Sequence, residues 1–345
     1  MKRIVTSILR RGAEALNLSG LDALAGHRYA GNGAIIILHS VVRDRADYLY
    51  DPIRTSARYL DRLLQHFRRR NVDIVSIDEA LSRLQQVDPA PFVHFTLDDG
   101  FKDNLTIALP IFERYGAPFT VFVTTAFIER RLDNWWMGAM ALVKQNDTIE
   151  IPALASSLCA ATLPEKISAY GHLVRLVDTG KLPLSALRAA FDKYRINLPE
   201  MLDPDALTLD ELRCLSRHPL VTIGGHTTNH LPLATLPRAE ARSEMLENKL
   251  WLERMLDRPV RHLAYPFGTA TACGPREADL ARDVGFDSAV TTRTANLFPA
   301  HAANPHALPR LRAFSEYESE RLVAFQRSGA ASALLSRFGN PVVTM

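Results

Sequence analysis

Short apolar runs alternate with amphipathic segments along most of this chain of 345 residues. Residues 33–42, GAIIILHSVV, form a nearly continuous apolar run, which is typical of a strand buried on both faces. Residues 55–70 then repeat apolar side chains at helical spacing, and Ser56 is placed to cap that helix. Repeated strand–helix units of this kind build a parallel sheet, either doubly wound or closed into a barrel.

The same alternation continues on both sides of a different, central region. It predicts strands at residues 72–77, 92–97, 118–124, 220–225, 260–268, 286–292 and 308–314, and helices at 78–86, 104–116, 207–218, 238–257 and 276–285. Asp78 is expected to cap the helix that begins there, and Gly116 to end the 104–116 helix. The pattern therefore predicts an α/β protein.

Residues 128–205 interrupt this alternation. They contain WWMGAMALV and ALRAAFDKYRI, which have helical patterns, and no clear strand. We expect a helical insertion into a domain spanning residues 33–314, followed by a helical tail over 315–345. The insertion follows the C-terminal end of the strand at 118–124. Because loops at that end of a barrel build the active site, we expect the insertion beside the mouth of the site.

Residues 1–32 have helical periodicity and a basic character. Arg10, Arg11 and Glu14 interrupt the apolar positions, so a signal peptide is not predicted. The helix is expected to pack on its own domain, with contact to an anionic membrane as the alternative. No apolar run reaches the length of a bilayer span, and three widely spaced cysteines are expected to be reduced. These features predict a cytoplasmic protein, with the inner face of the membrane as a more specific location.

Composition and motifs exclude several classes of function. The chain is 47% hydrophobic and 23% charged, which is ordinary for a globular protein. Its net charge of +3 is too small to indicate a nucleic-acid partner. Neither G-x-G-x-x-G nor G-x-x-x-x-G-K-[ST] occurs, so a nucleotide-binding loop is not predicted.

Chemistry-bearing side chains recur where the predicted strands end. Asp98 and Asp99 follow FVHFTL, although adjacent carboxylates repel each other and are costly to bury. His226 and His230 follow LVTIGG and are four residues apart. If these strand ends meet at one edge of the sheet, one aspartate and both histidines form a metal site, and the other aspartate is free to act as a base. The alternatives are a solvated Asp-Gly turn and two unrelated turn histidines.

Three motifs, FTLDDGF, HTTNH and YPFG, occur in the order that resembles the polysaccharide deacetylase family, carbohydrate esterase family four. The resemblance covers roughly residues 33–128 and 205–314. It implies a distorted (β/α)7-type barrel and a divalent metal ion, most commonly Zn²⁺. It also implies hydrolysis of an N-acetyl or O-acetyl group on a sugar.

The resemblance assigns roles to the first two motifs. Asp98 resembles the catalytic base, and Asp99 the metal-binding aspartate. His226 and His230 resemble the metal-binding histidines. The metal explains the carboxylate pair, because a nearby dication offsets the repulsion between two ionised groups.

The remaining expected contacts concern substrate. Tyr265 and Pro266 belong to the third motif, with Gly268, and are expected to shape one wall of the groove. Backbone near Tyr265 is expected to donate to the developing oxyanion. Trp135 and Trp136 open the insertion and are expected either to stack on sugar rings or to form a buried hinge.

The sequence departs from the family pattern at two positions. AYPFG lacks the arginine that orients the base, and Arg261 and Arg310 are the candidates to replace it. LPRLRAF lacks the histidine that acts as general acid, and His39 and His306 are the candidates there. We place Arg310 and His39 in the predicted catalytic set with Asp98.

The sequence thus predicts a metal-dependent deacetylase acting on an acetylated glycan or glycolipid, with a lipid-linked or nucleotide-linked intermediate of surface polysaccharide synthesis as the expected substrate. Hydrolysis of a small amide or formamide is one alternative. A non-catalytic carbohydrate-binding protein on a degenerate barrel is another. A non-haem iron oxygenase would share the ligand set, but its ligands would be expected on an antiparallel barrel.

Overall fold

The computed structural model describes residues 27–44, 53–313, 318–335 and 339–345. Most of the predicted helical segment 1–32 therefore lies outside the described residues, which begin with the 3-10 turn η1 (His27–Tyr29). The chain divides into two compact units, and the second contains Glu129–Ala206. The first unit contains the sheet and the residues of the predicted metal site.

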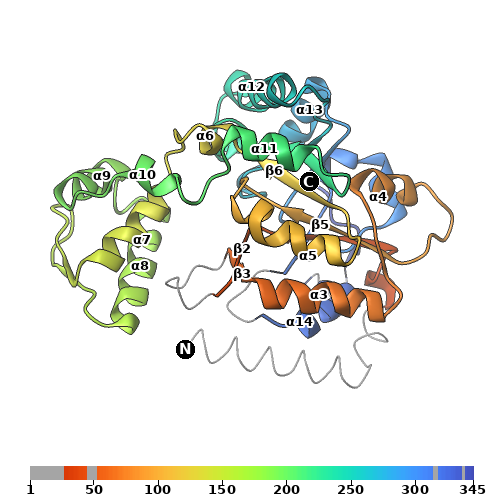
Figure 1. Ribbon diagram of the computed structural model, residues 1–345, viewed down its shortest axis with the longest axis horizontal. Coiled ribbons are helices and arrows are strands. Elements are labelled where there is room, and N and C mark those ends of the chain that lie inside the picture. Colours follow the sequence, from red (N-terminus) through yellow and green to blue (C-terminus); the bar gives the residue numbers. More distant parts are fainter. Residues whose placement is uncertain (1–26, 45–52, 314–317, 336–338) are drawn as a thin grey trace. The chain divides into compact units, whose positions relative to one another are not determined.

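One parallel sheet forms the centre of the first unit (Figure 1). Its strands are β1 (Gly33–Leu38), β4 (Asp73–Ile74), β5 (Phe92–Leu97), β6 (Phe119–Val123), β9 (Val221–Gly225), β10 (His262–Ala264), β11 (Ser288–Val290) and β12 (Leu311–Arg312). Seven strands follow the order β11-β10-β9-β6-β5-β1-β12, and β4 pairs with β5. Two further short strands, β2 (Ser40–Val42) and β3 (Arg54–Ser56), pair only with each other.

The two ends of the sheet approach closure. Val290 at the end of β11 forms a parallel bridge with Leu308, in the segment that leads into β12. The Leu308 N–H donates to the Ala289 carbonyl at 3.0 Å, and the Thr291 N–H donates to the Leu308 carbonyl at 2.8 Å. The predicted distorted (β/α)7-type barrel is confirmed, because strand order and this bridge curl the sheet around a common interior.

Most helices of this unit pack on the outer face of the barrel (Figure 1). Ile77, Ala80 and Leu84 instead pack with the inward-facing Phe92 and Phe122. The helices of this unit are α3 (Ala57–Arg69), α4 (Ile77–Leu84), α5 (Leu109–Arg114), α6 (Thr125–Ile128), α11 (Leu209–Ser216), α12 (Arg238–Leu256), α13 (Pro275–Val284), α14 (Glu320–Arg327) and α15 (Ala330–Leu335). Shorter turns are η3 (Asn104–Ala108), which is π-helical, and the 3-10 turns η4 (Leu233–Thr235), η5 (Pro299–Ala303) and η6 (Pro305–Ala307). None of the helices in the described ranges combines the length and apolar character that crossing a bilayer requires.

Strand β5 separates the outer core from the barrel interior and sets the direction of the Asp98 side chain. Val93, Phe95 and Leu97 belong to the core shared with the outer helices. His94 and Thr96 alternate with them and face the barrel interior, since successive side chains of a strand point to opposite faces. The same alternation carries Asp98 inward at the point where the strand ends. A buried strand therefore delivers a carboxylate to the interior edge of the sheet.

Local details both follow and depart from the sequence pattern. Ser56 caps α3 as expected, and its Oγ accepts a hydrogen bond from a first-turn N–H at 3.2 Å. The expectation for α4 was wrong, because the cap is Ser76 rather than Asp78. The first predicted strand breaks at His39 into β1 and β2. The helix predicted over 104–116 begins with the wider turn η3.

The second unit has its own apolar core, formed by residues that include Leu142, Leu173 and Phe191. Its elements are α7 (Trp135–Gln145), β7 (Thr148–Ile149), β8 (Leu158–Cys159), α8 (Leu163–Asp178), α9 (Leu184–Lys193) and α10 (Leu198–Leu202). The helical character follows the sequence pattern, whereas the short antiparallel pair β7–β8 was not expected. Trp135 packs against this core, and its ring meets that of Trp136 edge-on at 6.1 Å.

Candidate active site

A sharp turn after β5 presents the two aspartates. Asp99 has φ 80° and Gly100 has φ 92°, so two consecutive residues adopt the left-handed region. Glycine follows the doublet because this conformation strains other residues. The Asp98 N–H donates to Leu38 in β1 at 3.1 Å, and the Asp99 carbonyl accepts from Thr124 after β6 at 3.2 Å. Neighbouring strand ends on both sides thus fix the turn.

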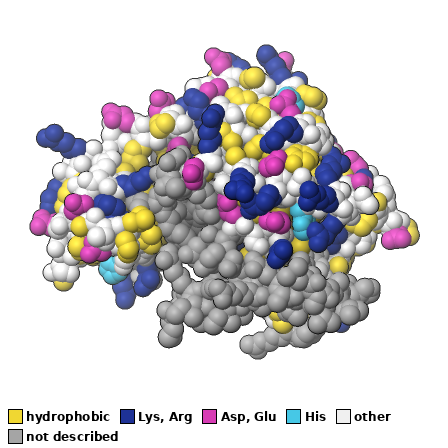
Figure 2. Space-filling model, turned by 60° about the horizontal axis from the view of Figure 1, so that its bottom comes forward, with side chains coloured by type: hydrophobic (Ala, Val, Ile, Leu, Met, Phe, Trp, Pro, Cys, Tyr) yellow, Lys and Arg dark blue, Asp and Glu magenta, His cyan; other side chains and the backbone are white. Residues whose placement is uncertain are grey.

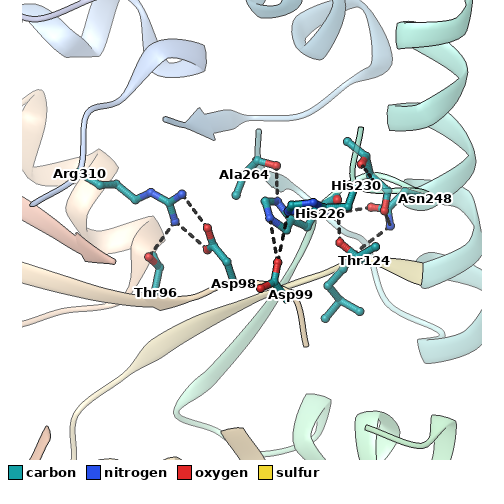
Figure 3. A network of polar contacts seen from close by, with 11 residues as sticks. Thr96, Asp98, Asp99, Thr124, His226, His230, Asn248, Ala264 and Arg310 are labelled. Atoms are coloured by element: carbon teal, nitrogen blue, oxygen red, sulfur yellow. Dashed lines mark hydrogen bonds and ion pairs between the residues drawn. The ribbon is translucent and has the colours of Figure 1, made fainter. Parts of the chain in front are cut away.

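A second loop, His226–His230, begins where β9 ends. His226 lies in the barrel interior, and its Nδ1 donates to the Ala264 carbonyl of β10 at 2.7 Å. This bond leaves the lone pair on Nε2, the nitrogen that faces Asp99 (Figure 3). The loop then turns back on itself, because Thr227 and His230 have left-handed φ values of 63° and 54°. This turn brings the His230 side chain to Asp99 as well.

Asp99, His226 and His230 form a group of potential metal ligands (Figure 3). Asp99 Oδ1 lies 3.4 Å from the Nε2 atom of each histidine. Ligand atoms about 2.0–2.1 Å from a tetrahedral Zn²⁺ stand about 3.3 Å apart, which matches both of these distances, and all three candidate ligand atoms lie within 4.8 Å of one another. Two imidazoles and one carboxylate also leave positions open for water and substrate. The donor set and its spacing therefore fit a divalent metal.

Charge and burial act against each other in this group. Burial by itself raises the pKa of Asp99, but hydrogen bonding to His226 and the charge of His230 lower it well below its usual range. Burial by itself lowers the pKa of His226, yet the contact with Asp99 and the charge of Asp98 raise it above its ordinary value. Burial lowers the pKa of His230 to about 4. The carboxylate is thus anionic and His230 neutral at pH 7, the forms that bind a metal.

Asp98 is held by a buried bidentate ion pair. Arg310 Nη1 and Nη2 donate to its two carboxylate oxygens at 2.7 and 2.8 Å, and both side chains are at most 2% exposed. Arg310 is itself oriented by the Thr96 hydroxyl at 3.1 Å and the Thr291 carbonyl at 2.8 Å. Burial raises the pKa of Asp98, but Arg310, together with the charges of His226 and His39, holds it below its usual range. Asp98 is therefore an oriented carboxylate that can accept a proton.

The family model described as polysaccharide deacetylase matches residues 85–288 of this chain. The chain belongs to the polysaccharide deacetylase family. Enzymes of this family are hydrolases acting on amides, and their substrates are acetylated carbohydrates. No curated protein sequence matches the chain.

Solved structures share the fold of this deacetylase at low sequence identity. The deacetylase PplD of Streptococcus pyogenes, solved in complex with acetate, has a TM-score of 0.57 and 17% identity, with 85% of this chain and 97% of that chain covered. IcaB from Ammonifex degensii has a TM-score of 0.53 and 16% identity, with coverage of 86% and 97%. A de-N-acetylase from Aggregatibacter actinomycetemcomitans has a TM-score of 0.54 and 15% identity, with coverage of 85% and 99%. At these identities the structures support the fold alone.

The candidates for the missing arginine and histidine occupy different places in the deacetylase. Arg310 contacts Asp98, whereas Arg261 pairs with Asp78 and Asp287 ahead of β10, at the opposite end of the strands. Arg261 therefore cannot replace the orienting arginine. His306 is likewise engaged elsewhere, with its Nε2 2.7 Å from the Phe286 carbonyl.

His39 lies in the break between β1 and β2, beside the aspartate turn. Its carbonyl accepts a hydrogen bond from Asn104 at 2.9 Å. Burial lowers the pKa of its imidazole, and the charges of Asp99 and Asp98 act in the opposite direction. His39 lies beside the aspartate doublet because the carbonyl of the residue before it, Leu38, accepts the Asp98 N–H at 3.1 Å, and its role as general acid remains a prediction.

The third motif contributes a different side chain from the two expected. Tyr265 is fully buried, and its hydroxyl donates to the His306 carbonyl at 2.8 Å, so its side chain cannot contact substrate. Pro266 is also buried. Phe267 is instead 46% exposed, and its ring centroid lies 4.9 Å from that of His230. Its left-handed φ of 61°, inside a tight turn, was the feature that sequence reasoning missed.

Proposed function

We propose that this deacetylase removes the N-acetyl group of an amino sugar by metal-assisted hydrolysis. The observation that carries the proposal is that the two adjacent aspartates, Asp98 and Asp99, have different partners. Asp99 joins two histidine nitrogens at ligand spacing, while its neighbour Asp98 is turned to Arg310 and kept out of that group. One carboxylate thus serves the metal and the other remains available for proton transfer.

The chain supplies both the metal ligands and the base. Asp99, His226 and His230 would hold the cation, and the N₂O donor set favours Zn²⁺. A dication held there would polarise the acetyl carbonyl and lower the pKa of a water molecule enough for attack at neutral pH. Asp98 accepts the proton of the attacking water, and the fork of Arg310 keeps its oxygens in one orientation.

The departing amine requires a proton. Hydrolysis forms a carbon–oxygen bond and breaks the amide carbon–nitrogen bond, which yields acetate and a free amino sugar. We assign the delivery of this proton to His39, because it follows Leu38, whose carbonyl accepts the Asp98 N–H, whereas His306 is engaged with the Phe286 carbonyl.

Phe267 gives the site an exposed aromatic wall. Its ring lies against the metal-binding His230 and remains partly open to solvent. Sugar rings present apolar C–H faces that suit an aromatic surface. This feature supports a carbohydrate substrate over a small amide or formamide.

We further propose that the enzyme works at the cytoplasmic face of a membrane on a lipid-linked glycan. Six exposed arginines, which we call the basic face, lie on or beside α3 and α5: Arg43, Arg58, Arg68, Arg69, Arg70 and Arg114. Of the acids on these two helices, Asp61 pairs with Arg114, which belongs to the basic face, and Glu113 pairs with His218, which does not. Figure 2 shows Lys and Arg side chains gathered on this side of the molecule. Arginines near an anionic leaflet contribute about 1 kcal/mol each to binding.

Metal content and acetate release test the proposed reaction together. The wild-type protein is expected to retain about one Zn²⁺ per chain after dialysis and to release acetate from N-acetylglucosamine oligomers. His226→Ala should lose both the metal and the activity. Asp98→Asn should keep the metal and lose most of the activity. A wild-type protein that binds no Zn²⁺ would overturn the proposed mechanism. Release of formate from small formamides, with no release of acetate from the sugar oligomers, would show that the substrate is a small amide.

A further inference from the structure

We propose that Asn248 is a positioning residue for the metal site, assisted by Glu244 one helical turn earlier on α12. Both residues hold the backbone of the loop His226–His230, which carries two of the three candidate ligands. This inference rests on the proposed metal-dependent function.

Asn248 is fully buried and connects two strand ends to the loop (Figure 3). Its Oδ1 accepts from the His226 N–H at 3.1 Å. Its Nδ2 donates to the Val123 carbonyl of β6 at 3.0 Å and to the Thr227 carbonyl at 2.8 Å. One amide group therefore fixes the residue that binds metal, the left-handed residue after it, and the neighbouring strand.

The orientation of this amide is determined by its partners. Both hydrogens of Nδ2 point to carbonyl oxygens, and Oδ1 points to an N–H. Turning the amide over would place Oδ1 against the Val123 and Thr227 carbonyls. Only an amide supplies one acceptor and two donors in this arrangement, so neither Asp nor Leu can reproduce it.

Gly225 shows how closely Asn248 approaches the strand. A Cβ atom on Gly225 would lie 2.5 Å from Asn248 Oδ1, which no real contact allows. The last residue of β9 is therefore glycine because the asparagine side chain occupies that space. The tight fit restricts the backbone from which His226 projects.

Glu244 fixes the other half of the loop. Its carboxylate accepts from the Asn229 N–H at 2.8 Å and from Asn229 Nδ2 at 2.6 Å. Its own carbonyl accepts from the Thr228 N–H at 3.2 Å. Asn229 immediately precedes His230, so the helix controls the approach to both histidines.

The loop needs such support because its conformation is unfavourable in isolation. Thr227 and His230 are not glycines, yet both adopt positive φ. Residues in this region persist only where their surroundings enforce it. Loss of the α12 contacts should let the loop relax and separate His226 and His230 from Asp99, which would weaken metal binding while leaving all three ligands in the chain.

Metal affinity tests this inference without relying on activity. We would measure the dissociation constant for Zn²⁺ by chelator competition and record the visible spectrum of the Co²⁺-loaded full-length protein. Asn248→Asp, of equal size, is expected to weaken Zn²⁺ binding about 10–100-fold and to alter the Co²⁺ spectrum. Leu252→Ala is the matched control, because Leu252 is also fully buried on α12 but contributes no polar contact to the loop. It should lower thermal stability and leave Zn²⁺ affinity within about twofold of wild type.

The outcomes separate the two hypotheses. If the wild-type protein does not bind Zn²⁺, the proposed function fails. If the wild type binds Zn²⁺ and Asn248→Asp binds it equally well with an unchanged Co²⁺ spectrum, the positioning role fails alone. An equal loss in Leu252→Ala would also overturn it, because general destabilisation would then explain the effect. Should Asn248→Asp not fold, Glu244→Gln carries the test, with wild-type affinity and spectrum as the contradicting result.

Discussion

At the residue scale, Arg310 determines both the orientation and the ionisation of Asp98. Its two parallel hydrogen bonds match the carboxylate, and its own position is fixed by Thr96 and Thr291. Lysine would keep the positive charge but would lose the fork geometry. The side chain therefore acts on catalysis through shape as well as charge.

Arg310→Lys is expected to lower kcat on the order of 10²-fold, because Asp98 would no longer be held in one orientation for proton transfer. Zn²⁺ content should stay at the wild-type level, since the ligands are untouched. Steady-state kinetics of acetate release, with elemental analysis of the same sample, checks both expectations. An unchanged kcat would show that the bidentate contact does not orient the base.

His39→Gln is expected to lower kcat about 10²-fold or more, with unchanged metal content, because the departing amine would lose its proton donor. His306→Gln is the matched control, since His306 contacts the Phe286 carbonyl and lies outside the site. Single-turnover acetate release measures the difference. Equal kcat values for wild type and His39→Gln would place the general acid elsewhere.

Phe267→Ala is expected to raise KM for an N-acetylglucosamine oligomer about 3–10-fold, with a smaller effect on kcat, because the aromatic wall contacts the sugar rather than the reacting bond. Leu250→Ala removes a comparably exposed apolar side chain on α12 and should leave KM unchanged. Initial rates across a substrate series provide the comparison. A KM unaffected by loss of the phenyl ring would remove Phe267 from the substrate site.

At the element scale, strand β5 combines structural and functional demands. Its outward side chains enter the main core, and two of its inward ones, His94 and Thr96, are buried polar groups. His94 is fully buried between β4 and β6, with its ring nitrogens 2.8 Å from the Val75 carbonyl and 3.0 Å from the Thr120 hydroxyl. Burial lowers the pKa of His94 to about 4. The strand is therefore sensitive to acid.

The pH dependence of folding follows from this shift. Below its ordinary pKa of about 6.5, the histidine takes up a proton in the unfolded chain but not in the folded one. The free energy of unfolding should therefore fall as pH drops from about 6.5 to about 4, by about 3 kcal/mol from this group. In His94→Gln the decline should be shallower, as measured by urea unfolding at several pH values. Parallel declines in the two proteins would contradict the assignment.

At the scale of the whole molecule, the basic face gives the enzyme a side suited to anionic lipid. Arg58 and Arg69 lie on the same outward stripe of α3, because eleven residues correspond to about three helical turns. This arrangement of charge supports the proposed contact with a membrane.

Charge reversal tests that location. Arg58→Glu/Arg69→Glu is expected to reduce cosedimentation of the full chain with vesicles containing phosphatidylserine by about tenfold at low salt, with little change on neutral vesicles. Arg242→Glu/Arg254→Glu makes the same change in net charge on exposed positions of α12 and serves as control. Equal losses in both variants would show that net charge, rather than this face, drives binding.

Much of the fold was accessible from sequence because the units are locally encoded. Alternating apolar runs and amphipathic segments placed β5, β6, β9 and their helices close to their observed bounds. The role of Asn248 and Glu244 is less evident from the sequence than the strands and helices are. The two residues are polar but lie within the buried stripe of α12, beside Ala241 and Met245. Such an interruption of an apolar stripe indicates a buried polar contact, but periodicity does not identify its partner.

The sequence by itself determined the α/β class and the order of the strands along the chain, and it singled out Asp99, His226 and His230 as candidate metal ligands. These depend on local periodicity and on motifs that are short in sequence. The tertiary structure confirmed the predicted placement of Arg310 at Asp98, and it alone decided that Phe267 rather than Tyr265 faces solvent and that α12 supports the histidine loop. Those outcomes depend on which strand ends become neighbours in the barrel and on which side chains become buried. Both properties arise from contacts between residues far apart in the chain.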